Sequence, residues 1–204
     1  SPTLLFKEVT GSVHSIEPNI ILYAPEMLIF VDETGCDKRL QGRYGYSFQG
    51  SQALIRRDFI RSPRISAIAA IGLDGPRAIK TFHESVNAEK FVKFLEYELL
   101  PILQPYNGIN PDSVVIMDNA CIHHVRRVRR LITQTGARLI FLPPYSPDLN
   151  PIEEAFSKVK GWIRSNGVVW ASLNRTGQVQ MIYEAFYQLT DEDCHGYYRH
   201  CEYI

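Results

Sequence analysis

Residues 139–154, LIFLPPYSPDLNPIEE, have the pattern of a strand, a stiff turn and a helix start. The apolar run at residues 139–142 suits a short strand, and Pro143 and Pro144 end it because proline has no backbone donor for a sheet. Asn150 is a preferred N-cap residue, and Pro151 suits the first helical position. The segment therefore predicts a strand that ends before Pro143 and a helix that begins at Asn150.

The predicted helix has apolar residues at helical spacing, which indicates a face packed on a core. These residues are Ile152, Phe156, Val159 and Ile163. Glu153 lies on the flank of this stripe, whereas Glu154 points away from the core and can pair with Lys158 one turn later. By itself, Glu153 fits a capping box that reaches back to Asn150. The alternative is that Glu153 is an acid of a functional site, and other parts of the chain favour it.

Length and composition indicate one domain of good size. The chain has 204 residues, of which 45% are hydrophobic, and this supports a substantial core. No apolar run is long enough to span a membrane, and the first residues lack a signal-peptide layout, so we expect an intracellular protein, nuclear in a eukaryotic host and cytoplasmic or nucleoid-bound in a bacterial one. Four irregularly spaced cysteines favour reduced thiols over a disulfide framework. They are Cys36, Cys121, Cys194 and Cys201.

The charges balance, with 22 basic and 22 acidic residues, which is unusual for a free-standing nucleic-acid-binding protein. The arginines nevertheless form two groups, and each is a candidate for DNA phosphate contact or, equally, a solvated face. The first group is Arg56, Arg57, Arg61 and Arg64, and the second is Arg126, Arg127, Arg129 and Arg130. A basic surface can therefore coexist with an acidic pocket.

The remaining elements predict an α/β layer architecture with a mixed sheet. Three strands come first, at residues 27–33, 42–49 and 65–73, with 77–82 as an optional edge strand. A helix at 87–100 follows, then a strand from 114 that ends in Asp118, a basic helix at 123–135 that stops at Gly136, and the strand at 138–142. A further helical region at 174–189 should pack back on the domain.

The tail carries two Cys-His pairs in mirror order, Cys194-His195 and His200-Cys201. Such a set offers zinc ligands, but the adjacency is not zinc-finger spacing. The favoured interpretation is two buried thiols on one helix, because Cys194 and Cys201 are seven residues apart.

Three acids stand out: Asp32 and Asp118 each end a predicted strand, and Glu153 enters a helix straight after a third strand. Ligand sites in open α/β sheets lie beyond the carboxyl ends of strands, so the three should meet at one end of the sheet. Three carboxylates repel one another unless a cation lies between them. Hard oxygen ligands suit Mg²⁺ or Mn²⁺, and a two-metal site serves phosphoryl transfer to water or to a 3′-hydroxyl.

Three blocks of this sequence resemble the signature motifs of DDE transposases of the mariner superfamily and its bacterial insertion-sequence relatives. The blocks begin with Asp32-Glu33-Thr34-Gly35 and Asp118-Asn119-Ala120, and end with PPYSPDLNPIE at residues 143–153. The 34 residues between Asp118 and Glu153 match the acid-ending branch and favour Glu153 over Glu154. The resemblance implies an RNase H-like catalytic domain at residues 27–165. Residues 1–26 would be a lead-in segment and 166–204 a C-terminal helical extension.

The resemblance also implies functional roles. Asp32 and Asp118 would bind both metal ions, and Glu153 would bind the second ion. The enzyme would hydrolyse phosphodiesters at transposon ends and join the freed 3′-hydroxyl to target DNA, commonly at a TA dinucleotide, as a homodimer on DNA. The helix-turn-helix units that relatives use to recognise transposon ends have no counterpart in residues 1–26.

Several residues near these motifs are candidates for auxiliary roles, each with a structural alternative. Asn119 could bind a metal-bound water or close a turn. His123 and His124 could touch the scissile phosphate or orient a water, although capping or core roles are favoured. Tyr145 could contact DNA, but we expect it to buttress the proline turn.

Two other functions compete with an active transposase. A domesticated or relic domain could bind DNA or protein without cleavage, and the presence of all three acids argues against it. A different RNase H-like nuclease, such as a resolvase or ribonuclease, is the other alternative. The proline-rich block and its spacing argue against that one.

Overall fold

Five strands form one mixed sheet in the computed structural model, which describes residues 20, 22–37, 40, 50, 64–120, 123 and 126–204. The order is β3-β2-β1-β4-β5; β1 pairs antiparallel with β2 and parallel with β4. The strands are β1 (Leu28–Cys36), β2 (Ile65–Gly72), β3 (Gly75–Phe82), β4 (Val114–Met117) and β5 (Arg138–Phe141). The edge strand expected at 77–82 is therefore confirmed as β3. The strand expected at 42–49 lies outside the described residues, as do Arg56, Arg57, Arg61 and His124.

The position of Asp32 in β1 differs from the prediction. We expected a strand that ends just past Asp32, but β1 continues to Cys36. The reason is that β1 has partners of different lengths on its two sides. β2 pairs with it as far as Cys36, whereas the β4 pairing stops at Val31 and Met117. Asp32 thus lies at the end of the parallel part of the sheet but inside its own strand.

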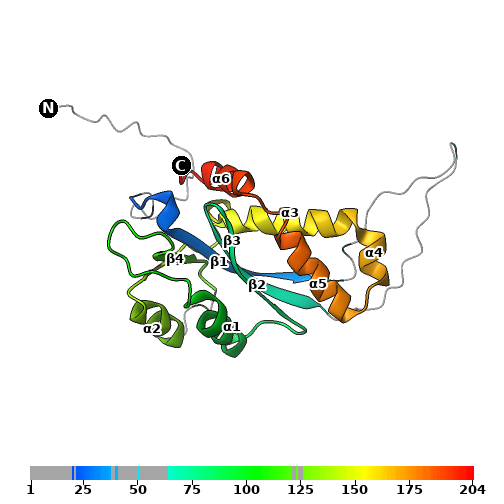
Figure 1. The fold of residues 1–204 in the computed structure, drawn as a ribbon, viewed down its shortest axis with the longest axis horizontal. Coiled ribbons are helices and arrows are strands. Elements are labelled where there is room, and N and C mark those ends of the chain that lie inside the picture. The colour runs from blue at the N-terminus through cyan, green and yellow to red at the C-terminus, as the bar shows by residue number, and fades with distance from the viewer. Residues whose placement is uncertain are drawn as a thin grey trace.

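Two helical layers cover the sheet, one on each face (Figure 1). Helices α1 (Ala88–Phe94) and α2 (Arg126–Gln134) cover one face. The Asn87 side chain caps α1 by accepting from the Lys90 backbone N–H at 2.9 Å, as its sequence predicts. A π-helical turn, η2 (Leu95–Leu99), extends α1. The structure gives α2 a later start than the expected His123, while Gly136 at φ +83° follows its end as predicted.

Helix α3 (Pro151–Ser165) covers the opposite face and enters from the 3₁₀ turn η3 (Pro147–Leu149). Its start agrees with the sequence to within one residue. The predicted apolar stripe is buried in full, with Ile152, Phe156, Val159 and Ile163 each at most 1% exposed. This burial fixes which side of α3 faces the sheet.

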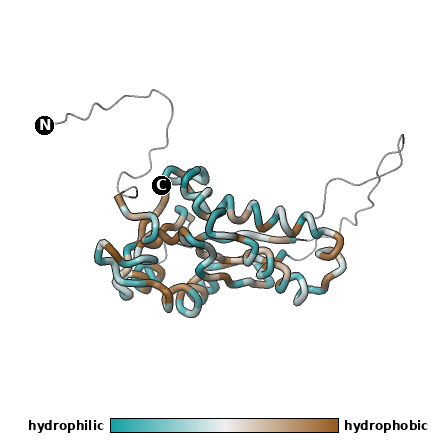
Figure 2. Tube along the Cα trace, turned by 45° about the horizontal axis from the view of Figure 1, so that its top comes forward, coloured by the Kyte–Doolittle hydropathy of each residue, from teal (hydrophilic) through white to brown (hydrophobic). Residues whose placement is uncertain are grey.

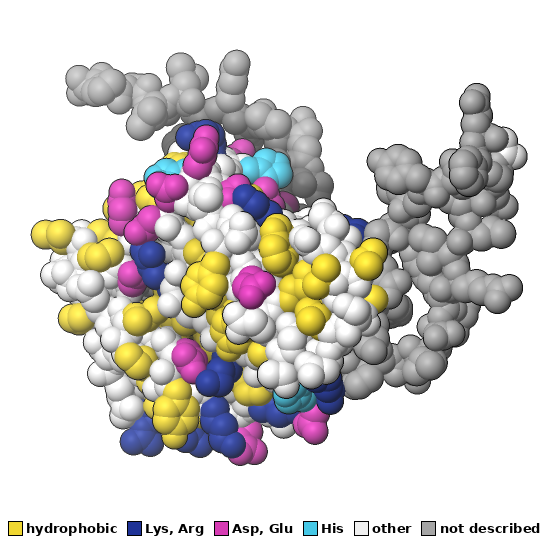
Figure 3. Space-filling view, turned by 45° about the vertical axis from the view of Figure 1, so that its right-hand side comes forward, with side chains coloured by type: hydrophobic (Ala, Val, Ile, Leu, Met, Phe, Trp, Pro, Cys, Tyr) yellow, Lys and Arg dark blue, Asp and Glu magenta, His cyan; other side chains and the backbone are white. Residues whose placement is uncertain are grey.

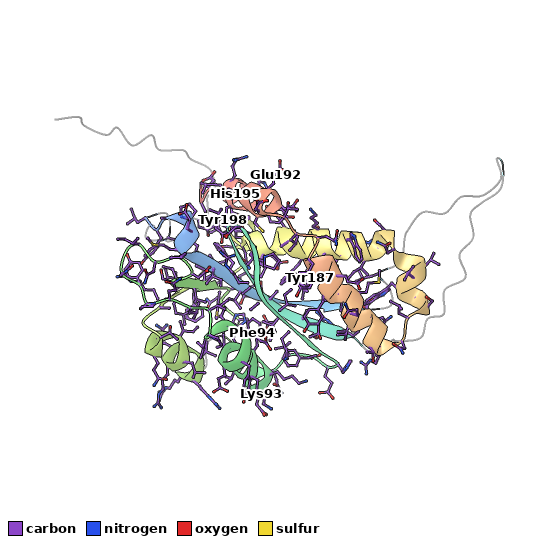
Figure 4. The ribbon with its side chains drawn as sticks, in the orientation of Figure 1. Lys93, Phe94, Tyr187, Glu192, His195 and Tyr198 are labelled. Carbon is purple, nitrogen blue, oxygen red and sulfur yellow. The ribbon has the colours of Figure 1, made fainter. Side chains whose placement is uncertain are left out.

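The C-terminal helices pack on α3 and share its hydrophobic cluster. They are α4 (Gly167–Ser172), α5 (Arg175–Phe186) and α6 (Asp191–His200). We did not predict α4, because Gly167 suggested a break in the chain. Apolar residues concentrate in the strands between the helical layers (Figure 2), and Figure 4 shows Tyr198 on the side of α6 toward the sheet. The Tyr198 hydroxyl donates to the Leu28 carbonyl at 2.9 Å and so ties α6 to the start of β1.

Two side-chain pairings differ from the sequence expectation. Glu154 pairs with His200 at 2.6 Å rather than with Lys158, and Lys158 pairs with Asp193. Both partners come from α6, which a helical repeat within α3 cannot reveal. In the tail, Cys194 in α6 and Cys201 directly after it are both buried, as the favoured interpretation of two buried thiols expects.

The described residues form no helix that could cross a membrane. None of their helices combines the length and apolar character that a bilayer crossing requires.

Candidate active site

Asp32 and Asp118 lie side by side on neighbouring strands. The parallel register pairs Val31 with Met117, so the next residue on each strand is an acid. Neighbouring strands are about 4.8 Å apart, which brings the two carboxylates into strong electrostatic contact. The sheet therefore brings the first two predicted site acids together, with Asp32 within β1 and Asp118 directly after β4.

The carboxyl group of Asp32 is buried, and its charged form is disfavoured. Only 6% of Asp32 is exposed. Burial is the main cause that raises its pKa from 3.8 to about 8, and repulsion from Asp118 is the second. The Glu33 backbone N–H donates to Oδ1 at 2.7 Å and opposes this rise, while the charges of Glu33 and Glu153 add to it. The folded chain thus holds a carboxyl that releases its proton only at an unusually high pH.

Asn150 links the start of α3 to Asp32. It occupies the N-cap position, but its side chain does not cap the helix. Instead its Nδ2 donates to Asp32 Oδ2 at 2.9 Å in a buried hydrogen bond. The Glu153 backbone N–H donates to the Asn150 carbonyl at 3.0 Å, so the exposed Glu153 begins its helical turn beside this contact. The capping role predicted for the Asn150 side chain is therefore wrong, and the residue connects the first acid to the helix of the third.

Asp118 has a second set of partners on the opposite side of the site. Its Oδ1 lies 2.6 Å from His123 Nδ1 and accepts from the Ala120 backbone N–H at 3.0 Å. His123 is fully buried, and its Nε2 lies 3.0 Å from Glu33 Oε2. Sequence reasoning weighed His123 as an auxiliary residue but missed Glu33. A strand residue next to Asp32 faces the other side of the sheet, where His123 lies, and that alternation was the available signal.

The donor chemistry of the three acids fits a divalent cation, although their side chains are not arranged to hold one. No group of three or more His, Cys, Asp or Glu side chains in the described residues has ligand geometry for a metal ion as they stand. Mg²⁺ and Mn²⁺ nevertheless prefer oxygen ligands such as carboxylates, and all three acids offer them. A cation here would also relieve the burial and repulsion that raise the pKa of Asp32.

The other predicted site residues that the structure describes are exposed. Asn119 is exposed beside Asp118. Tyr145 is 96% exposed at φ +59°, so the expected buttressing of the proline turn is wrong. Arg64 is exposed, and its guanidinium lies across the backbone of Gly35, where a Cβ would come within 1.6 Å of it. A side chain at residue 35 would therefore displace the flexible guanidinium of Arg64.

The second arginine group forms an exposed basic face on α2, and its four members are Arg126, Arg127, Arg129 and Arg130. Arg127 pairs with Glu96 at 2.7 Å, and Arg129 lies 5.6 Å from the ring centroid of Phe141. The neutral chain distributes its charge unevenly: in Figure 3, Lys and Arg gather along the lower edge of the visible face.

A cavity of about 650 Å³ lies at the other end of the sheet, near the starts of β1 and β4. Glu26, Asp74, Arg77 and Asp112 line it, and Arg77 bonds both aspartates. None of the predicted site acids lines this cavity.

A mixed five-stranded sheet between helical layers, with acids at the end of its parallel strands, defines an RNase H-like fold of the kind found in nucleases and transposases. The model of the DDE superfamily endonucleases matches residues 27–173, and the chain belongs to that family. This confirms the resemblance inferred from the three motifs. No curated protein matches the chain in sequence.

Solved structures of Mos1 transposase share the fold. The Mos1 strand transfer complex has a TM-score of 0.62 at 18% identity, covering 97% of this chain and 63% of that one. The catalytic domain of Mos1 mariner transposase has a TM-score of 0.56 at 18% identity, covering 87% and 78%. The Mos1 mariner paired end complex with Mn has a TM-score of 0.59 at 16% identity, covering 98% and 65%. The chain thus spans under two thirds of the Mos1 chain in either complex.

Proposed function

We propose that this chain is the catalytic domain of a metal-dependent DNA transposase of the mariner type. It would hydrolyse phosphodiesters at transposon ends and transfer the freed strands to target DNA. Two observations support the proposal: the β1–β4 register sets Asp32 beside Asp118, and Asn150, directly before the helix of Glu153, donates a hydrogen bond to Asp32. Membership in the DDE endonuclease family supports the reaction class.

In this proposal the catalytic domain comprises residues 27–165, preceded by a lead-in segment at 1–26 and followed by a helical extension at 166–204. Asp32, Asp118 and Glu153 would hold Mg²⁺ or Mn²⁺ in a two-metal site. Solved structures of the Mos1 catalytic domain with Mg and with Mn support this choice of ions. The ions would supply positive charge to offset the negative charge that develops on the phosphodiester during displacement.

The chemistry consists of two displacements at phosphorus. In the first, the oxygen of water attacks the phosphorus, and the bond to the 3′ oxygen breaks to leave a 3′-hydroxyl and a 5′-phosphate. In the second, that 3′-hydroxyl oxygen attacks a phosphorus of target DNA and displaces the 3′ oxygen of the target strand. The three carboxylates would hold the divalent ions against which the phosphodiester is oriented, and Asn150 keeps the Asp32 carboxylate from rotating.

DNA would approach over the open end of the sheet. The exposed α2 arginines and Arg64 would contact backbone phosphates, and the exposed Tyr145 ring would reach the DNA beside them. The proposal includes transposon ends and TA-containing target DNA as substrates and a homodimer on DNA. Relatives solved as a strand transfer complex and a paired end complex support these partners.

A supercoiled-plasmid nicking assay with Mg²⁺ or Mn²⁺ tests the proposal on the full-length protein. We expect Asp32→Asn, Asp118→Asn and Glu153→Gln each to abolish nicking. The matched control is Glu154→Gln, which changes the adjacent acid that pairs with His200 and should leave nicking intact. Equal nicking by wild type and Asp118→Asn would show that a contaminant or another site does the cutting.

A second function is favoured by one observation: the acids do not close a metal shell as they stand. A domesticated domain that binds DNA or protein without cleavage would have no need for such a shell. If wild type and Asp118→Asn are equally inert while both bind DNA, the binding function is correct.

A further inference from the structure

A buried imidazole bridges two acids on the far side of Asp118 from Asp32. His123 Nδ1 lies 2.6 Å from Asp118 Oδ1, and its Nε2 lies 3.0 Å from Glu33 Oε2. The ring packs against Phe91, with centroids 4.5 Å apart, and the side chain is 0% exposed. Both ring nitrogens thus have a fixed carboxylate partner, and water has no access to the ring.

The two contacts require protons on both nitrogens. An ionised carboxylate only accepts hydrogen bonds, and a neutral imidazole donates from only one nitrogen. The bridging ring is therefore an imidazolium that donates to Asp118 and to Glu33. Charge-assisted bonds of this kind are shorter and stronger than neutral ones.

The bridge acts on the second side-chain torsion of Asp118, which sets how the carboxylate is turned. The second side-chain torsion of Asp has broad preferences, so partners decide how the carboxylate is turned. Asp118 lies just past the end of β4, and its side chain is 43% exposed. The Ala120 N–H and His123 Nδ1 both reach Oδ1 and so turn the carboxylate to one orientation.

Glu33 completes the bridge from the opposite face of β1. Side chains of successive strand residues point to opposite faces, so Glu33 cannot join Asp32 in one ligand set. It is 18% exposed and bonds the buried His123 instead. Without it, the imidazolium would be a buried charge with a single acid partner, which is costly.

We propose that Glu33 and His123 are positioning residues for Asp118. Glu33 fixes His123, and the Nδ1–H of His123 holds the Asp118 carboxylate in the orientation that binds a divalent cation. This inference rests on the proposed function. It assigns neither residue to substrate or metal contact, and it explains why an acid directly follows Asp32 in the strand. Residues that orient metal ligands typically change metal affinity by about 10–100-fold when replaced.

Two substitutions of His123 by amide side chains test its contact with Asp118 and its contact with Glu33 separately. In His123→Asn the side-chain amide replaces Nδ1 and still donates to Asp118. In His123→Gln the amide replaces Nε2, which reaches Glu33 but not Asp118. Mn²⁺ binding, followed through the EPR signal of free Mn²⁺, is the readout, and thermal melts establish that each variant is folded. We expect His123→Asn to bind Mn²⁺ within about threefold of wild type and His123→Gln to bind at least tenfold more weakly.

Glu33→Gln provides a second variant should a change at the buried ring prevent folding. It keeps an acceptor for His123 but removes the charge, and we expect Mn²⁺ affinity to fall several-fold. Glu154→Gln is the matched acid-to-amide control and should bind Mn²⁺ as wild type does.

The outcomes distinguish this inference from the proposed function. If both His123 variants and Glu33→Gln bind Mn²⁺ as tightly as wild type, or if both His123 variants lose affinity equally, the positioning role is wrong while the three-acid site stands. If wild type itself binds Mn²⁺ no better than Asp118→Asn, the metal site fails, and the proposed function fails with it.

Discussion

Replacing Asp32 with Asn should stabilise the fold while it abolishes activity. The unfolded chain releases the Asp32 proton near its ordinary pKa of 3.8, whereas the folded chain holds it until about pH 8. Between these values the folded state binds more protons than the unfolded state, so stability falls as pH rises. Asn has no proton to release, and the variant escapes this loss.

The size of the effect follows from the width of that window. Between the unfolded-state pKa of 3.8 and pH 7 the pH rises by roughly 3 units, and each unit lowers the stability of the wild type by about 1.4 kcal/mol. The upper bound on this loss at pH 7 is therefore roughly 4 kcal/mol. The effective dielectric constant at buried protein sites is higher than that of a dry interior, which reduces this loss. We therefore expect Asp32→Asn to be more stable than wild type by about 2–4 kcal/mol at pH 7 and by close to zero at pH 4.

Urea unfolding of both proteins at pH 4 and pH 7, with EDTA present, measures the difference. The pH-dependent gain isolates Asp32, because the rest of the chain is common to both proteins. Adding Mn²⁺ should then raise the stability of wild type by about 2.7 kcal/mol at a hundred times its dissociation constant and leave Asp32→Asn nearly unchanged. A variant that is less stable than wild type at pH 7, or equally stabilised at both pH values, would refute the reasoning.

Three further substitutions test the scaffold. Phe156→Ala removes a ring that is 1% exposed in α3 and should cost about 3–5 kcal/mol of unfolding free energy in denaturant titrations. Thr190→Ala breaks the capping box that Thr190 forms with Asp193 at the start of α6 and should cost about 1 kcal/mol, measured the same way. Gly136→Ala places a Cβ 2.8 Å from Pro105 at a positive φ, and the melting temperature should fall by several degrees, consistent with a loss of about 1–2 kcal/mol.

The sequence predicts the local features of the site well, because local chemistry determines them. Prolines end the strand before Pro143, and Asn150 and Pro151 start α3 within one residue of the expected position. The ends of β4 and α2 also follow from an acid after an apolar run and from Gly136. Each of these signals acts over a few residues, within reach of propensity and periodicity.

The partners of the site residues could not be predicted, because they come from distant parts of the chain. Asn150 and Asp32 are 118 residues apart, and His123 and Glu33 are 90 apart. Sequence assigned the Asn150 side chain to the nearest unsatisfied backbone donors, but a buried carboxyl group gains more from a buried amide than a helix start open to solvent does. Local rules identify a polar residue correctly and then assign it the wrong partner whenever a buried group competes for it.

The C-terminal part of the chain also positions the site, through contacts with β1 and with the start of α3. Tyr198 of α6 donates to the carbonyl of Leu28, where β1 begins, and Tyr203 donates at 2.8 Å to the carbonyl of Leu149, directly before Asn150. Both rings also pack against Phe30, two residues from Asp32. The distance between β1 and the start of α3 is therefore set by residues more than forty positions beyond Asn150. Because Asp32 and Glu153 are carried by those two elements, α6 and the residues directly after it help to set their separation although they contribute no acid to the site.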